Sequence, residues 1–151
     1  MIILALDCAT KTGWAVFIDG KLMESGVKAF TKRRGETNGM MFLKFRKWLG
    51  EFYKLYTPDL IIYEQASHRG GAATEICSNL TGRAQEIAAD WDINCTSVRP
   101  SELKKYATGK GNAGKTEMMR ASERLLGRTP IDDNEADAVL IGAWAVEEFG
   151  A

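Results

Sequence analysis

The sequence is poor in the residues that build zinc sites and disulfide frameworks. Its 151 residues include three cysteines, at positions 8, 77 and 95, and one histidine, His68. The cysteines are odd in number, lie far apart and form no Cys-x-x-Cys pair, which argues against both zinc binding and a disulfide framework. This pattern favours a reducing compartment. A single histidine also excludes any site that needs several imidazole ligands.

Long apolar runs and an excess of one charge are also missing. No stretch is long and apolar enough to cross a bilayer, and no basic leader precedes the first apolar run. We therefore expect a soluble, cytoplasmic protein with no membrane partner. The 20 basic and 20 acidic residues cancel, so the net charge neither favours nor excludes nucleic acid. A hydrophobic content of 45% over residues 1–151 fits one domain with its own core.

The charges that are present are distributed unevenly. Basic residues dominate residues 28–54 and 99–124, whereas residues 129–151 contain acids and no cation. A neutral chain with this distribution suits a polyanion held around a metal-binding cluster of acids. For any one of these stretches, an ordinary solvated surface is the alternative.

Hydrophobic periodicity predicts alternating strands and helices. Strands are expected at residues 1–6, 14–18, 21–30, 60–63 and 93–98, and helices at residues 40–56, 72–91, 101–107, 115–126 and 133–147. Short turns at residues 8–13 and 19–20 predict that the first strands form an antiparallel meander. The aromatic residues of the 40–56 helix recur at helical spacing, so we expect them in the core and not on a base-stacking surface. Gly82, Ala84 and Ala88 narrow the 72–91 helix, which suits close packing of another helix, including one from a second copy.

Three acids, which we call the acid triad, stand where the predicted elements can bring them together. Asp7 and Glu64 each end an apolar strand, and Asp137 lies near the start of the last helix, on its apolar stripe. If the two strands are neighbours, the carboxylates converge at one edge of the sheet. Asp7 taken alone could equally cap its own turn, whereas an acid among the apolar residues of a helix has little structural reason to be there.

Two further oxygen donors precede Asp137 on the last helix. Asp133, one turn earlier, shares its face, and Asn134 holds the alternative position three residues before it. Asp133 alone could be a helix cap. Converging carboxylates repel and raise one another's pKa, and hard cations such as Mg²⁺ relieve that repulsion. Two such ions about 4 Å apart can stabilise both oxygens of an in-line phosphoryl displacement.

Taken in order, these motifs resemble the RuvC-like branch of the RNase H-like nucleases, over nearly the whole chain. The matching segments are residues 3–16 (ILALDCATKTGWAV), 61–65 (IIYEQ), 80–87 (LTGRAQEI), 109–115 (GKGNAGK) and 133–138 (DNEADA). The fit is closest to the compact resolvases of phages. The resemblance implies an α/β fold with a mixed five-stranded sheet, a three-stranded antiparallel meander plus two parallel strands, flanked by helices.

The resemblance also implies roles for individual residues. The acid triad would supply catalytic metal ligands, and Lys115 would stabilise charge at the scissile phosphate. In the family's bacterial pattern an acid stands three residues before the last one, where this chain has Asn134. Either Asp133 serves as the fourth catalytic ligand, or Asn134 is a neutral ligand, or the position has been altered.

The implied reaction is hydrolysis of phosphodiester bonds in four-way (Holliday) junctions during DNA recombination and repair, leaving 5′-phosphate and 3′-hydroxyl ends. It would use two Mg²⁺ ions, which Mn²⁺ can replace. Paired incisions imply a homodimer, built on the 72–91 helix, and a phage protein would act in the cytoplasm of the host cell. We expect DNA contacts from Lys11, Arg33, Arg34, His68, Arg69, Lys104, Lys105 and Lys110. The family has a junction-opening aromatic residue where this chain has Ser67-His68-Arg69, so junction opening is not assigned by the resemblance.

Other functions remain open at this point. The same chemistry could act on flaps, forks, duplex DNA or RNA in hybrids. A non-catalytic nucleic-acid-binding domain would be expected to lose its acids, yet the triad is intact. An ATPase of the actin and sugar-kinase type shares the motif at residues 7–13 but needs a second lobe, for which the chain is too short.

Overall fold

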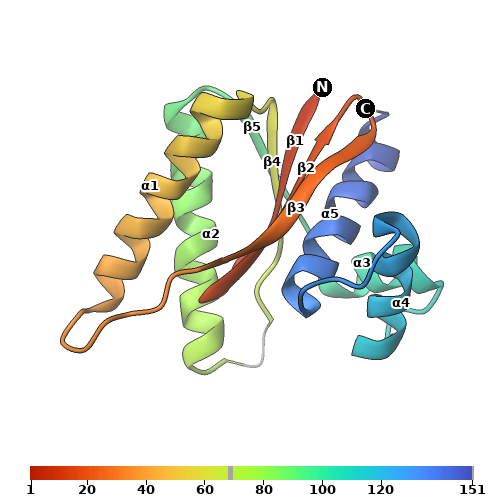
Figure 1. The fold of residues 1–151 in the computed structure, drawn as a ribbon. Helices are drawn as coiled ribbons and strands as arrows, with labels where there is room; N and C mark the ends of the chain where they lie inside the picture. Colours follow the sequence, from red (N-terminus) through yellow and green to blue (C-terminus); the bar gives the residue numbers. More distant parts are fainter. Residues whose placement is uncertain (68–69, 151) are drawn as a thin grey trace.

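The computed structural model describes residues 1–67 and 70–150, and a mixed five-stranded sheet runs through it with helices on both faces (Figure 1). The strands are β1 (Ile2–Asp7), β2 (Lys11–Ile18), β3 (Lys21–Ala29), β4 (Leu60–Glu64) and β5 (Asn94–Val98), in the spatial order β3-β2-β1-β4-β5. β2 pairs antiparallel with both β1 and β3, whereas β4 pairs parallel with β1 and β5. The predicted meander with two parallel strands is therefore confirmed.

The helices divide between the two faces of the sheet. α1 (Asn38–Tyr56) and α2 (Ala72–Asp90) cover one face, and α5 (Asp133–Phe149) covers the other together with α3 (Pro100–Thr108) and α4 (Lys115–Leu126) (Figure 1). Side chains alternate along β1, because successive strand residues point to opposite faces. Ile3 and Ala5 join the core under α5, whereas Leu4 and Leu6 join the core under α1 and α2. This two-sided burial explains why β1 is a continuous apolar run.

The aromatic residues of α1 lie in the core, as predicted. Phe45, Trp48 and Phe52 are buried. The ring of Phe30 lies 5.6 Å from that of Phe45 and 5.5 Å from that of Trp48, both edge to face. These rings fix α1 on the sheet and are not free to stack on bases.

The small residues of α2 have separate roles. Ala84 and Ala88 are buried in the same core cluster as the aromatic residues of α1, so their small size serves packing within this chain. Gly82 differs, because a Cβ placed there would meet nothing within 4 Å. Of the three small residues predicted to pack against a helix of a second copy, Gly82 is therefore the one with open space at its Cβ position.

The turn predicted at residues 8–13 is shorter than expected. β2 already begins at Lys11, and Gly13 is paired with Asp7 at the end of β1. The Thr12 hydroxyl, which is buried, donates a hydrogen bond to the Ala9 carbonyl at 2.7 Å and so closes the turn. The apolar pattern missed this end of β2 because Lys11, Thr12 and Gly13 are not apolar, although the antiparallel ladder extends to them.

α5 approaches the sheet at two glycines. A Cβ on Gly13 would lie 1.9 Å from the backbone oxygen of Asn134, and one on Gly142 would lie 2.2 Å from Phe17 Cε1. Any side chain at Gly13 would therefore push the start of α5 away from β2.

Across the residues that the structure describes, no helix combines the length and apolar character needed to cross a membrane.

Candidate active site

The acid triad assembles at one edge of the sheet. β1 and β4 are parallel neighbours in which Leu6 lies beside Tyr63, so the next residues, Asp7 and Glu64, end their strands together. Asp137 reaches them from α5. One carboxylate oxygen from each of the three residues lies within 4.8 Å of the other two. The predicted convergence of the triad is therefore a feature of the fold.

A cleft of about 590 Å³ opens beside these acids. Glu64 and Asp137 line it together with Asp133, and two lysines, Lys104 and Lys115, line it as well. The cleft thus combines acids that attract a cation with bases that attract a phosphate.

The surroundings of the acid triad disfavour the charged form of each carboxyl group. Burial, and then the carboxylates of Asp137 and Glu64, raise the pKa of Asp7 well above its usual range. Burial likewise raises the pKa of Asp137 to about 7, with Glu64 and Asp133 adding to the shift and the two lysines opposing it. Burial also raises the pKa of Glu64, which Lys104 partly offsets.

This donor set fits a hard divalent cation. In the described part of the chain, no ion pair ties up a carboxylate of the triad. Three oxygen donors from different elements converge there, and such oxygen-rich sites suit Mg²⁺, Mn²⁺ or Ca²⁺ more than softer metals. A cation bound to these carboxylates would neutralise their charge and so relieve their mutual repulsion.

Asp133 does not cap α5. The cap is Asp132, whose Oδ1 accepts a hydrogen bond from the Glu135 backbone N–H at 3.0 Å. Asp133 is the first residue of the helix, lines the cleft, and lies 3.5 Å from Lys115 Nζ. Asn134 instead places its backbone oxygen against Gly13. The capping alternative for Asp133 is therefore wrong, and its carboxylate faces the cleft.

The two lysines occupy different positions around the acids. Lys104 on α3 is half-buried and influences both Glu64 and Asp137. Lys115 begins α4, and its side chain is 87% exposed, at the mouth of the cleft. Lys104, which was predicted to contact DNA, lies in the lining of the cleft.

The other predicted DNA-contacting residues are dispersed. Lys11, at the start of β2, is exposed, and so are Arg33 and Arg34 in the loop between β3 and α1. Lys105 and Lys110, on α3 and the loop after it, are exposed as well. Apart from Lys104, the members of this set that the structure describes lie outside the lining of the cleft. His68 and Arg69 lie outside the described residues.

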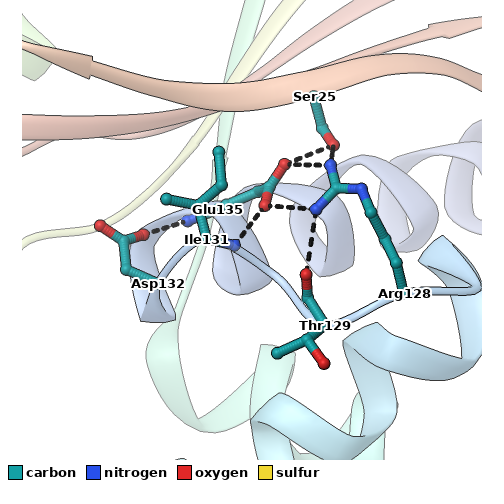
Figure 2. A network of polar contacts seen from close by, with 6 residues as sticks. All are labelled: Ser25, Arg128, Thr129, Ile131, Asp132 and Glu135. Atoms are coloured by element: carbon teal, nitrogen blue, oxygen red, sulfur yellow. Dashed lines mark hydrogen bonds and ion pairs between the residues drawn. The ribbon is translucent and has the colours of Figure 1, made fainter.

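An ion pair behind the acids, between the buried Glu135 and the exposed Arg128, was not predicted from the sequence. The Glu135 side chain is fully buried on the first turn of α5 and is bound by Arg128 and Ser25 (Figure 2). Burial alone would raise the pKa of Glu135, but hydrogen bonds from Arg128, Ile131 and Ser25 hold it below its usual value. The spacing of Asp132 and Glu135, typical of a capping box, is the signal that could have drawn attention to it.

Comparison with known proteins agrees with this geometry, although no protein-family model matches the chain. The chain is 33% identical over 100 residues to the crossover junction endodeoxyribonuclease RuvC of Corynebacterium glutamicum, and the match covers 64% of this chain and 45% of that protein. The matched segment thus spans about half the length of this relative. The RuvC of Rickettsia conorii is 26% identical over 149 residues, covering 93% of this chain and 94% of that protein.

Solved structures share the fold. The structure of Thermus thermophilus RuvC superimposes with a TM-score of 0.80 at 19% identity, over 99% of this chain and 97% of that one. Fowlpox virus resolvase, solved in complex with its substrate Holliday junction DNA, gives a TM-score of 0.68 at 15% identity, over 99% of each chain. The chain thus has the fold of these resolvases, the RNase H-like fold that the sequence led us to expect. In sequence, the chain is similar to crossover junction endodeoxyribonucleases named RuvC.

Proposed function

We propose that this chain is a divalent-metal-dependent endonuclease that cuts four-way DNA junctions by hydrolysis, leaving 5′-phosphate and 3′-hydroxyl ends. The observation that carries the proposal is the meeting of Asp7, Glu64 and Asp137 within 4.8 Å, beside a cleft that also holds two lysines. The names of the relatives support the same substrate, since they are crossover junction endodeoxyribonucleases. The fowlpox virus neighbour was solved with junction DNA.

The acid triad would hold the cation, and Asp133 is the fourth donor we propose, because it lines the same cleft. Asn134 remains the alternative donor, and Mg²⁺, replaceable by Mn²⁺, is the cation we expect, in two sites. A bound divalent cation would supply charge neutralisation and Lewis-acid activation for attack on phosphate. Because the pKa of Asp137 is about 7, cation binding near neutral pH also displaces a proton from this carboxyl.

The lysines supply the positive charge that the phosphate requires. Lys104, half-buried near Glu64 and Asp137, would hold the phosphate over the acids. Lys115 would approach the same phosphate from the mouth of the cleft, because its Nζ lies 3.5 Å from Asp133 and is free to turn toward another anion. Both lysines would stabilise negative charge that develops on the phosphate in the transition state.

The exposed cations outside the cleft would follow the DNA backbone. Lys11, Arg33, Arg34, Lys105 and Lys110 are free to contact phosphates without reading sequence, and His68 and Arg69 stay predictions. Resolution of a junction requires two incisions, so we propose a homodimer, with α2 at the interface. A single domain and a cytoplasmic location also stay predictions.

The decisive experiment is incision of a labelled synthetic four-way junction with Mg²⁺, Mn²⁺ or chelator. Flaps, forks, linear duplex and RNA–DNA hybrids are run beside it, and the ends are identified by ligation. We expect metal-dependent cutting of the junction that Asp7→Asn abolishes, with Asp90→Asn, at the exposed end of α2, as the matched control. Preferential cutting of another substrate would replace the junction in the proposal. Cutting by Asp7→Asn, or in chelator, would overturn the metal site itself.

A further inference from the structure

A polar cluster of Ser25, Arg128 and Glu135, in which Glu135 is buried and Arg128 is 48% exposed, lies behind the candidate metal site. Glu135 is two residues from Asp133 and two from Asp137, and its side chain is 0% exposed. Ser25 belongs to β3, and Arg128 to the segment between α4 and α5 (Figure 2). The cluster therefore joins an edge strand, a connecting segment and the first turn of α5.

Every contact of the Glu135 carboxylate is directional. Its Oε1 accepts hydrogen bonds from Arg128 Nη1 at 3.1 Å and from the Ile131 backbone N–H at 2.7 Å. Its Oε2 accepts from Arg128 Nη2 at 2.7 Å and from the Ser25 hydroxyl at 2.8 Å. Arg128 Nη1 also donates to the Thr129 carbonyl at 3.1 Å. A two-pronged arginine–carboxylate pair of this kind fixes both partners in orientation as well as in distance.

Glu135 projects from one side of the start of α5, and Asp133 and Asp137 project from the opposite side. Residues two apart on a helix point about 200° apart, so Glu135 faces β3 while Asp133 and Asp137 face the ends of β1 and β4. Between these two sides, the Asn134 backbone rests against Gly13. Rotation of α5 about its axis would have to break the bonds of Glu135 before it could move the acids.

We propose that Arg128 and Ser25, through Glu135, are positioning residues that hold Asp133 and Asp137 at the place where they share a cation with Asp7 and Glu64. This inference rests on the proposed function, since it assumes that the acids bind a divalent cation. A purely stabilising role is the competing explanation. It is the weaker one, because Arg128 is 48% exposed, and an ion pair with a solvent-exposed partner adds little net stability.

The test measures Mn²⁺ affinity by calorimetry, well below the melting temperature of each variant. Arg128→Lys keeps the charge but loses the two-pronged geometry, and Ser25→Ala removes one hydrogen bond. The double variant Arg128→Met with Glu135→Met removes both charges while preserving volume, so it separates geometry from electrostatic cost. Phe45→Leu, in the core on the opposite face of the sheet, is the control for lost stability.

We expect Arg128→Lys and the double Met variant to bind Mn²⁺ on the order of tenfold more weakly, the usual effect of removing a group that orients metal ligands. Ser25→Ala should lose less, and Phe45→Leu should lower the melting temperature with the affinity unchanged. If the variants bind Mn²⁺ as tightly as the wild type, or Phe45→Leu weakens binding equally, the positioning role is wrong while the metal site stands. If the wild-type protein does not bind Mn²⁺, the proposed function itself fails.

Discussion

At the scale of single residues, the acids at the edge of the sheet are held in an unfavourable state. Asp7, Glu64 and Asp137 all have raised pKa values, with burial the largest cause in each case. Natural proteins keep such unfavourable groups mainly where a function requires them. Burial and mutual repulsion of the charged carboxylates lower the free energy of unfolding, and binding of a cation raises it again.

The raised pKa values of these buried acids predict how stability depends on pH. Asp137 has a pKa of about 7 in the folded chain against an ordinary 3.8, so between these values the folded state binds more protons than the unfolded state. The free energy of unfolding should therefore fall as pH rises from 4 to 7, by at most about 4 kcal/mol from this residue. Urea unfolding in chelator at pH 4.5 and 7.5 measures the fall.

Asp137→Asn supplies the comparison for that experiment. It should show a shallower fall than the wild type, because the asparagine side chain does not titrate. Asp7 contributes with the same sign, and because Asp137 helps to raise the pKa of Asp7, the difference between the two proteins reports Asp137 together with its effect on Asp7. Equal slopes for the two proteins, or stability that rises over this interval, would contradict the raised pKa.

At the scale of elements, the site depends on how α5 meets the sheet. Gly13 in β2 allows that approach, because a Cβ there would lie 1.9 Å from the Asn134 backbone oxygen. Backbone atoms cannot swing aside as the end of a flexible side chain can. Gly13 thus allows α5 to approach the sheet closely, in addition to pairing with Asp7 beyond the turn between β1 and β2.

Gly13→Ala should therefore displace the start of α5 and cost about 1–3 kcal/mol of unfolding free energy, as overpacking does. It should also reduce the rise in melting temperature that Mn²⁺ produces, because Asp133 and Asp137 move with the helix. Gly50→Ala in α1 is the matched control, since a Cβ there meets nothing within 4 Å. We expect the control to be neutral or to raise stability, because alanine favours helix. A Gly13→Ala protein with wild-type stability would refute the steric argument.

The elements differ in how well the sequence predicted them. β1 and β4 were predictable because both are apolar runs that end at an acid, and the aromatic spacing of α1 predicted its buried face. The first residues of β2 were not, since Thr12 and Gly13 resemble a turn. Glu135 was also missed, because its partners Ser25 and Arg128 lie 110 and 7 residues away. No local pattern shows that such separated residues meet inside the protein.

At the scale of the whole molecule, the convergence of the acid triad was predictable and the positions of the exposed cations were only partly so. The triad could be inferred because strand ends and a helix stripe have known directions. The positions of exposed cations depend on loops, whose course the sequence does not specify, and Lys104 proved to lie in the cleft. The surface nevertheless supports two predictions, one about DNA binding and one about self-association.

Arg33 and Arg34 lie in the exposed loop between β3 and α1. If both contact phosphates, replacing them with alanine should reduce the slope of log affinity against log salt by about 2, because each contact releases about one counterion. Fluorescence anisotropy with a labelled junction in chelator, over a series of salt concentrations, measures the slope. Lys21→Ala, at the far end of the meander from the acids, is the control. An unchanged slope would remove the loop from the DNA-binding surface.

Self-association through α2 is the second prediction. Gly82 lies on α2 with open space at its Cβ position, so Gly82→Leu should fold normally and yet weaken a dimer that packs there. Sedimentation velocity over a range of concentrations measures the effect, with Gly50→Leu on α1 as the control. A wild-type protein that stays monomeric at high concentration would contradict the homodimer. A Gly82→Leu protein that still dimerises would move the interface elsewhere.

The order of the acids along the chain also affects when the protein becomes able to act. Asp7 on β1 leaves the ribosome well before Asp137, which lies on α5, after the other helices and strands that the structure describes. A chain still in synthesis carries only part of the ligand set until α5 has emerged and docked. The proposed nuclease would thus remain inert toward the genome during its own translation, without any inhibitor to restrain it.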